Sequence, residues 1–448
     1  MSDFNLFQQI CIQIFTANLA GAFFGTEKFL QRAIDAAANH AVDKYLAKYG
    51  WKITWGPRVW KSPDSHFYEG LDNCWMITMA PGVVYPDGAK YDTYVVAIAG
   101  TAVFSAKDWV QEDFGVDHVI PFDAFTKTFK EGPIIEPQKT PKTGEGPFCA
   151  WGTAWGAYQI VTNTSPEGNP GAGTTILQYL AGLNKDGGDF RVIFTGHSLG
   201  GALSPFLSLA AKANSLIPAL ATTPDNILTF PAAGATPGDG LLGDAYGKLF
   251  PVSGPGGYQQ WNTNLFNTLD IVPQAWSTDD TQDRFLDKIV GIYGTLEGKI
   301  HHQIEGMVGK AKSRAEASGI IYQPIEGNPF TGTPPDHPPK RFLKFIFEAV
   351  KQHTKAYHDE VGVGKVLAQI YLVAASIKEV EKKNARQAAM GMPVIRFAAD
   401  LMEGDEDDSS EVPEGNGGDF KAGIPDDNLD GIPEGANTAY PYDCILDA

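Results

Sequence analysis

The hexapeptide Gly196–Gly201, which reads Gly-His-Ser-Leu-Gly-Gly, constrains the fold of this chain more than any other segment. The apolar run Phe190–Thr195 before it is typical of a buried strand, and Ala202–Ala213 after it is typical of a helix. A turn this sharp from strand to helix holds its central serine in a strained conformation with the hydroxyl exposed. The segment therefore predicts a nucleophile at Ser198, whereas a glycine-rich turn with an incidental serine is the alternative.

Strand and helix patterns alternate along most of the chain, which implies a mostly parallel sheet with helices on both faces, an α/β fold. The expected strands are Trp51–Trp60, Cys74–Met79, Tyr94–Ala99, Phe190–Thr195, Asn226–Phe230 and Asn264–Asn267. The expected helices are Thr26–Leu46, Trp155–Val161, Thr174–Leu183, Ala202–Ala213, Arg341–His353 and Lys365–Lys383.

A helical insertion is expected at about residues 278–318. Apolar residues from Phe285 to Met307 recur every three or four positions and form one helical stripe, thinned by glycines. Packing against the core is the expected role of this stripe, and contact with a membrane surface is the alternative. The Pro-rich stretch Gly327–Pro339 is expected to be a linker, and Glu131–Pro147 a loop.

The charge of the chain divides it into two parts. The formal net charge is −18, but residues 401–448 hold 14 acidic residues and one basic residue, so they carry −13 of it. We therefore expect one catalytic domain over residues 1–400 and an acidic, unpacked tail over residues 401–448. A negative balance argues against nucleic-acid binding, because displacing phosphate counterions needs a cationic surface. It also argues against strong attraction to anionic membranes.

A serine nucleophile needs a base, and the base needs an orienting acid, in the chain order Ser, Asp or Glu, His for this architecture. Asp270 ends a strand-like stretch, so it fits the acid; a turn-capping aspartate before Pro273 is the alternative. The backbone N–H of Leu199, at the start of a helix, is the natural oxyanion donor. The residues alone leave five histidines open as the base, namely His301, His302, His337, His353 and His358.

Four segments taken together resemble the class 3 lipases, the fungal-lipase type of α/β-hydrolase. They are Ala99–Thr101 followed by Asp108–Asp113, then Gly152–Tyr158, Gly196–Gly201 and Asn267–Pro273. The resemblance implies an α/β-hydrolase fold in which Ser198 is the nucleophile and Asp270 the acid. It also implies that Thr101 supplies a second oxyanion donor. The histidine of the family often precedes a tyrosine, as His353 precedes Tyr357, so His353 is the implied base and His358 the alternative.

The family places a lid helix just after the residue that matches Thr101. In this sequence the corresponding segment is Phe104–Phe114, which carries Trp109. Such a lid covers the acyl pocket in water and opens at a lipid surface. The alternative is a surface helix with one buried tryptophan.

The acidic tail contains one pattern that fits the first half of a calcium loop. Asp426, Asn428 and Asp430 alternate before Gly431, so their oxygens could converge on one cation. The twelfth position is Asn437 rather than a bidentate glutamate, so a solvated acidic segment is the other interpretation. The expected chemistry itself requires no cofactor.

The sequence thus predicts a serine carboxylic-ester hydrolase, with triacylglycerol as the first substrate class and transient contact with a lipid interface. The alternatives are a phospholipase A1, an esterase of soluble or feruloyl esters, and a non-catalytic hydrolase-like binding protein. The four cysteines Cys11, Cys74, Cys149 and Cys444 match neither a zinc site nor a disulfide framework. No cleavable signal or membrane span is expected, which leaves a cytoplasmic location and leaderless export both open.

Overall fold

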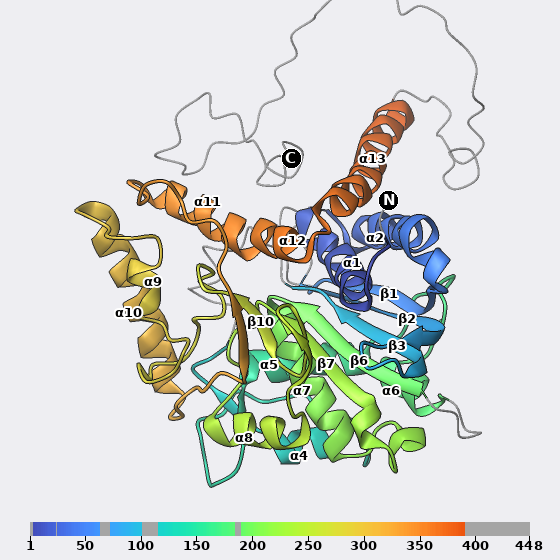
Figure 1. Ribbon diagram of the computed structural model, residues 1–448, viewed down its shortest axis with the longest axis horizontal. Helices are drawn as coiled ribbons and strands as arrows, with labels where there is room; N and C mark the ends of the chain where they lie inside the picture. The colour runs from blue at the N-terminus through green and yellow to red at the C-terminus, as the bar shows by residue number, and fades with distance from the viewer. Residues whose placement is uncertain (1–2, 24, 63–71, 101–114, 184–189, 390–448) are drawn as a thin grey trace, which may run out of the picture.

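The computed structural model describes residues 3–23, 25–62, 72–100, 115–183 and 190–389, and the remaining residues are drawn as a grey trace in Figure 1. Within the described residues, a seven-stranded sheet runs through the molecule in the order β1-β2-β3-β6-β7-β10-β11. Its strands are β1 (Lys52–Trp60), β2 (Asn73–Val84), β3 (Lys90–Ile98), β6 (Phe190–His197), β7 (Ile227–Ala232), β10 (Asn264–Asn267) and β11 (Gly327–Phe330).

The sheet is mostly parallel, as the sequence predicted. Strands β1, β2 and β3 pair antiparallel, whereas β3, β6, β7, β10 and β11 pair in parallel. In the register of the parallel part, Ile98 lies opposite Gly196, and Gly196 lies opposite Pro231. The carboxyl ends of β3, β6 and β10 therefore meet at one edge of the sheet, where open α/β sheets bind their ligands.

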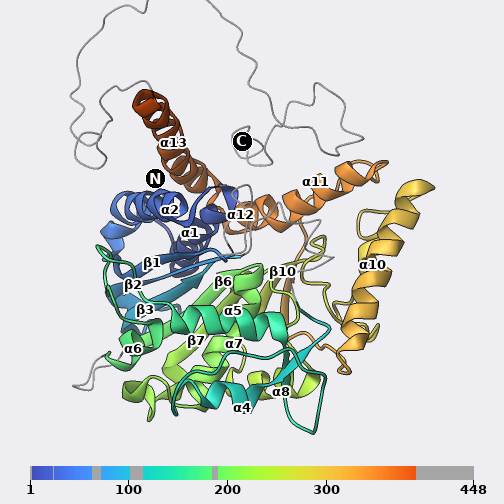
Figure 2. The same ribbon diagram turned by 180° about the vertical axis from the view of Figure 1, so that it is seen from behind.

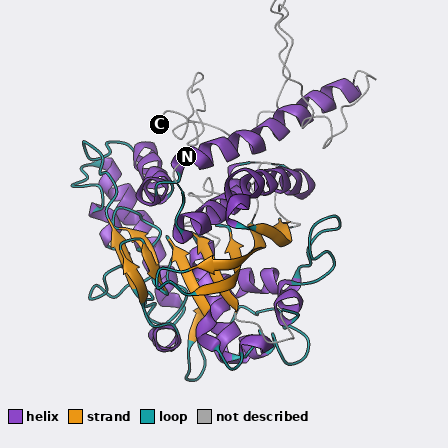
Figure 3. Ribbon diagram, turned by 45° about the vertical axis from the view of Figure 1, so that its right-hand side comes forward, coloured by secondary structure: helices purple, strands orange, loops and turns teal. Residues whose placement is uncertain are grey.

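Helices cover both faces of the sheet, so this prediction too is confirmed (Figures 1 and 2). One face carries α1 (Leu6–Asn18), α2 (Glu27–Ala41), α12 (Lys355–Val361) and α13 (Gly364–Ala389), which share one apolar core with the strands. The other face carries α4 (Phe122–Lys127), α5 (Trp151–Thr162), α6 (Ile176–Ala181), α7 (Leu199–Ala213) and α8 (Gly240–Leu249) around a second core. Coloured by secondary structure, Figure 3 shows the strands enclosed by helices.

Helix α1, near the start of the chain, is almost entirely buried. Asn5 caps it with a reciprocal pair of hydrogen bonds to Gln8, and 11 of its 13 residues are buried. A helix that is apolar all round belongs in a core rather than on a surface, and α1 packs on β2, β3 and β6. Its last residue, Asn18, reaches the carboxyl edge of the sheet.

The helical insertion consists of two helices rather than the single stripe expected from the sequence. These are α9 (Lys288–Gly291) and the longer α10 (Lys299–Ala317), which pack with α11 (Phe342–His353) around a third apolar cluster. The break lies at Gly294 and Gly298, whose φ angles of 94° and 61° are incompatible with a continuing helix. Packing, the expected role, accounts for the buried face of α10.

The expected linker Gly327–Pro339 begins instead with β11, which extends the sheet in parallel beside β10. Pro329 hid this strand because proline cannot donate to a ladder and argues against a central strand. Here β11 is the last strand in the sheet order, where a missing N–H faces no partner strand.

Two short ribbons, β4 (Val119–Pro121) with β5 (Phe148–Ala150) and β8 (Ser253–Gly256) with β9 (Gln259–Trp261), complete the strands of the described residues.

In the part of the chain that the structure describes, no helix is both long and apolar enough to cross a membrane. Cys11, Cys74 and Cys149 are unbridged and buried, and burial raises the pKa of each thiol.

Candidate active site

Ser198 sits at a strained turn between β6 and α7. Its φ of 61° and ψ of −123° lie outside the regions that side-chain-bearing residues normally occupy. The backbone N–H of Ser198 donates to the carbonyl of Ala232 on the next strand, at 3.1 Å. This bond holds the turn at the carboxyl edge of the sheet, and the elbow geometry predicted from the sequence is present.

The glycines around Ser198 are required by backbone contacts. A Cβ at Gly196 would lie 2.4 Å from the carbonyl oxygen of Gly200, and one at Gly200 would lie 2.2 Å from that of Ile98. Both distances are far below van der Waals contact, so a side chain at Gly196 would push β6 away from α7, and one at Gly200 would push α7 away from β3. Gly100 is as close to the serine itself, since its Cβ would lie 2.6 Å from Ser198 Cβ.

Asp270 and His353 meet at the same edge. Nδ1 of His353 lies 2.8 Å from Oδ2 of Asp270, whose side chain is fully buried. The other carboxylate oxygen, Oδ1, accepts the backbone N–H of Val272 at 3.0 Å. The Nδ1 contact favours the tautomer in which Nε2 of His353 is the basic nitrogen, as a histidine base requires. Two roles were considered for Asp270, an acid beside a histidine and a cap of the turn before Pro273. In the structure Asp270 has the contacts of both, because Oδ2 lies beside His353 and Oδ1 accepts a hydrogen bond within the turn.

Tyr357 is a third member of this cluster that sequence reasoning used only as a marker for His353. Its hydroxyl donates to Asp270 Oδ2 at 2.8 Å and accepts the backbone N–H of Asn267 at 3.0 Å. Burial raises the pKa of Tyr357 well above its usual value, and the charge of Asp270 adds to the effect, so the hydroxyl keeps its proton. The signal in the sequence was the spacing of one helical turn between His353 and Tyr357, but this spacing does not show that Tyr357 contacts Asp270.

The other histidines after Asp270 lie elsewhere. His301 and His302 are on α10 and pair with Glu305, and His337 is exposed. His358 is buried on α12 with its ring 4.4 Å from that of Phe15, edge to face. Burial lowers the pKa of His358 to about 3, and the positive charge of Lys355 adds to the effect. Among the five candidates, the structure brings His353 to Asp270 and packs His358 as an uncharged core residue.

A second buried histidine precedes the serine. His197 ends β6, and its Nε2 lies 2.7 Å from the backbone carbonyl oxygen of His353. The two rings are 4.6 Å apart between centroids. Because His197 is joined to Ser198 by one peptide bond, this contact places the backbone of the base candidate beside the residue that precedes the nucleophile candidate.

The expected oxyanion donors are only partly described. Leu199 is the first residue of α7, where backbone N–H groups lack intrahelical acceptors and the helix dipole is positive. Gly100 places the end of β3 against Ser198. Thr101, the lid segment Phe104–Phe114 with Trp109, and the tail residues Asp426, Asn428 and Asp430 lie outside the described residues.

Within the described ranges, no group of three or more His, Cys, Asp or Glu side chains could hold a metal ion.

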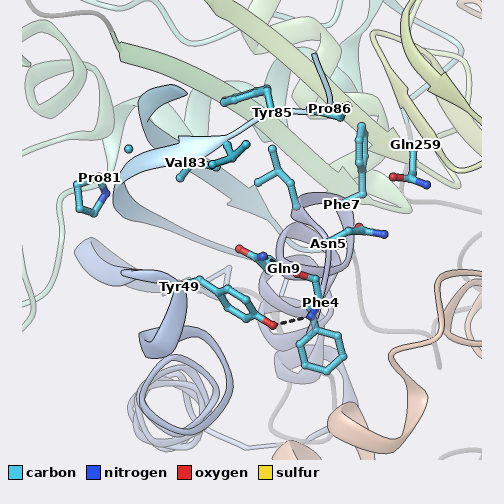
Figure 4. Close-up of a pocket in the computed structure, with 13 residues that line it drawn as sticks. Phe4, Asn5, Phe7, Gln9, Tyr49, Pro81, Val83, Tyr85, Pro86 and Gln259 are labelled. Carbon is cyan, nitrogen blue, oxygen red and sulfur yellow. Dashed lines mark hydrogen bonds between the residues drawn. The ribbon is translucent and has the colours of Figure 1, made fainter. Parts of the chain in front are cut away.

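A cavity of about 410 Å³ opens beside the first turn of α1 and the end of β2, lined by residues including Phe4, Phe7, Tyr49, Val83 and Tyr85 (Figure 4). These residues lie at the opposite end of α1 from Asn18, roughly 20 Å away at 1.5 Å per helical residue. The cavity is therefore separate from Ser198.

Residues 95–279 match the family model of the class 3 lipases. This match confirms the resemblance found in the sequence, and it supports the activity of a lipase-type ester hydrolase. The matched segment contains Gly100, Ser198 and Asp270 but ends before His353 and Tyr357. A comparison with curated proteins finds no match.

Two solved lipase structures are similar to this chain to different degrees. The crystal structure of the M37 lipase superposes with a TM-score of 0.62 at 22% sequence identity, covering 85% of this chain and 100% of that one. The Lip2 lipase from Yarrowia lipolytica gives a TM-score of 0.36 at 14% identity, covering 62% of this chain and 77% of that one. The M37 superposition confirms the α/β-hydrolase fold.

Proposed function

We propose that this protein is a serine carboxylic-ester hydrolase of the triacylglycerol lipase type. The observation that carries the proposal is the contact of Asp270 with His353 beside the strained turn at Ser198. In this proposal, Nε2 of His353 takes the hydroxyl proton of Ser198 while the serine oxygen attacks the ester carbonyl. The N–H of Leu199 and that of Thr101 stabilise the oxyanion. His353 then protonates the leaving alcohol, and water hydrolyses the acyl-enzyme by the same steps.

Tyr357 and Val272 support the acid in this mechanism. Each donates a hydrogen bond to Asp270, so the carboxylate is held in one orientation when His353 becomes positively charged. A carboxylate fixed in this way holds the imidazole in the tautomer that accepts the serine proton.

A lipid substrate is favoured by the outer face of α11. Leu343 and Phe347, one helical turn apart, are 69% and 49% exposed, while Phe345 and Ala349 on the other side of the helix are buried. Lys340, Arg341 and Lys344 are exposed beside this apolar face. An apolar stripe bordered by lysine and arginine is typical of a helix that lies on a lipid surface, and fatty-acid products would add anionic carboxylates there. The same helix ends at His353, so such a surface would lie next to the proposed base.

Labelling with a fluorophosphonate, with a Ser198→Ala control, tests the chemistry. We expect the native protein to be labelled and to hydrolyse p-nitrophenyl esters, and the variant to do neither. Ester hydrolysis that survives in Ser198→Ala would exclude Ser198 as the nucleophile. Absence of labelling in the native protein would support a non-catalytic binding protein.

The substrate class is tested by comparing emulsified triolein, phosphatidylcholine vesicles and soluble p-nitrophenyl butyrate. A triacylglycerol lipase gains activity when triolein exceeds its solubility limit. Preference for phosphatidylcholine would indicate a phospholipase A1, and preference for the soluble ester without a gain at the interface would indicate an esterase.

A further inference from the structure

We propose that Asn18, the last residue of α1, is a positioning residue. It fixes the end of β3, which leads to the proposed oxyanion donor Thr101, and the proposed base His353 relative to Ser198. This inference rests on the function proposed above. The side-chain oxygen of Asn18 accepts the backbone N–H of Gly100 at 2.7 Å, and its Nδ2 lies 2.9 Å from Nδ1 of His197. One amide thus contacts the residue before Thr101 and the residue before Ser198.

The contact with Asn18 determines which nitrogen of His197 carries the proton. The amide nitrogen of Asn18 can only donate, so Nδ1 of His197 must accept. Nε2 of His197 is then protonated and donates to the carbonyl oxygen of His353 at 2.7 Å. Burial and the neighbouring His353 and His358 hold the pKa of His197 well below its usual value, so the ring stays neutral.

These hydrogen bonds and the covalent structure of His353 together form one continuous path. It runs from the N–H of Gly100 through Asn18 and His197 to the backbone of His353, and from the ring of His353 to Asp270. The path ties together the ends of β3, β6 and α11, which are far apart in the sequence. A shift of about 1 Å in any of these segments would misplace reacting atoms by enough to cost about 100-fold in rate.

Asparagine suits this position because the path needs one acceptor, for the N–H of Gly100, and one donor, for Nδ1 of His197. The two ends of a single side-chain amide supply both. Alanine offers neither group. Aspartate has the same shape and would still accept the N–H of Gly100, but it cannot donate to Nδ1 of His197. Asn18 lies outside the segment that matches the lipase family, so the family match assigns it no role.

The experiment compares Asn18→Ala and Asn18→Asp with a control on the same helix, Gln8→Ala. Gln8 donates to the carbonyl of Val361 at 2.9 Å, so its loss also loosens α1 but leaves the path intact. We expect Asn18→Ala to lower kcat for p-nitrophenyl butyrate by about 100-fold with KM within about twofold of the native value. Fluorophosphonate labelling should slow in parallel, while Gln8→Ala stays close to native in both measurements.

The pH profile of Asn18→Asp separates positioning from packing. The introduced carboxylate can only accept, so His197 can bond both to it and to the His353 carbonyl only if both of its ring nitrogens are protonated. The groups that face His197 are His353, His358, Tyr357 and the ring of Phe15. We therefore expect kcat of Asn18→Asp, relative to native, to rise as the pH falls, whereas the ratio for Asn18→Ala should stay flat.

The inference would be overturned by native kcat in either variant, by a loss that matches that of Gln8→Ala, or by a flat ratio for Asn18→Asp. If Asn18→Ala does not fold, the isosteric Asn18→Asp still gives the decisive profile. A native protein without fluorophosphonate labelling would refute the proposed function. A labelled and active native protein with unaffected Asn18 variants would refute this inference alone.

Discussion

At the residue scale, the site depends on a few positions where a backbone approaches too closely for a side chain, or where a buried polar group is held by specific hydrogen bonds. Gly100, Gly196 and Gly200 belong to the first kind, because each lies within 3 Å of backbone or of Ser198 when a Cβ is added. Asp270 belongs to the second kind, since it is fully buried and bonded to His353 and Tyr357. Both kinds of position lead to predictions about rate rather than about the fold.

Gly100→Ala should reduce kcat by about 100-fold while the protein remains folded. The added Cβ would lie 2.6 Å from Ser198 Cβ, so the end of β3 or the serine must move. The measurement is kcat for p-nitrophenyl butyrate beside a thermal unfolding curve. Unchanged kcat would mean that the end of β3 does not position the reacting groups.

Asp270→Asn should lower kcat by about 10⁴-fold, the scale expected when an orienting carboxylate becomes an amide. The amide can offer its N–H to His353 and so favour the tautomer with the wrong basic nitrogen. Single-turnover hydrolysis at fixed pH would measure the loss. A decrease of less than tenfold would assign Asp270 to turn capping, the alternative raised by the Pro273 that follows it.

At the element scale, α11 has two faces of different character. Its inner face packs Phe345 in the apolar cluster with α9 and α10, and its end supplies His353. Its outer face leaves Leu343 and Phe347 exposed. Fully burying a side chain of this size is worth roughly 1.5–3 kcal/mol, so under the proposed function the exposed parts of these two side chains would add to binding at a lipid surface.

The double variant Leu343→Gln/Phe347→Gln should therefore hydrolyse emulsified triolein at least tenfold more slowly, with native activity on soluble p-nitrophenyl butyrate. Leu372→Gln on α13 is the matched control, because Leu372 is 51% exposed and lies on another helix. Equal loss on both substrates would point to a folding defect, and no loss on either would remove α11 from the lipid surface.

At the scale of the whole molecule, buried histidines make stability depend on pH. The pKa of His358 is lowered to about 3 in the folded protein, against about 6.5 when unfolded. A lowered pKa means that the folded state resists protonation. The contribution of His358 to stability is thus complete above pH 6.5 and is lost as the pH falls from 6.5 towards 3. His197, whose pKa is also lowered, acts in the same direction.

In His358→Phe, the decline in the free energy of unfolding below pH 6.5 should be shallower by up to about 1.4 kcal/mol per pH unit. Phenylalanine keeps an aromatic ring beside Phe15 but takes up no proton. Urea unfolding at pH 7.5, 6.0 and 5.0 measures the slope in both proteins. Identical slopes would show that His358 does not contribute to the acid sensitivity.

Removing residues 401–448 should leave ester hydrolysis within about twofold of native, because the proposed catalytic groups all lie earlier in the chain. The deletion changes the formal net charge at pH 7 from −18 to −5, so solubility near neutral pH is the property expected to fall. Assays of both lengths in the presence and absence of Ca²⁺ would check this. An inactive truncation would make the tail part of the enzyme.

The elbow could be predicted from the sequence alone, because its strained turn and the close contact between Gly196 and Gly200 involve only a few consecutive residues. The sequence also determined the alternating elements, whose periodicity is local. It could not predict β11, since whether Pro329 is tolerated depends on β11 being the last strand of the sheet. Nor could it choose among five histidines from the residues alone.

Which side chains meet at the site follows from the packing of the whole molecule. His353 lies 83 residues after Asp270, and Asn18 lies at the other end of the chain, yet both reach the edge where β3, β6 and β10 end. Such contacts follow from the parallel pairing of strands and from the packing of α1 and α12 on them. Hydrogen-bond geometry over those distances leaves no local pattern, because it is fixed by the packing of the whole sheet and its helices.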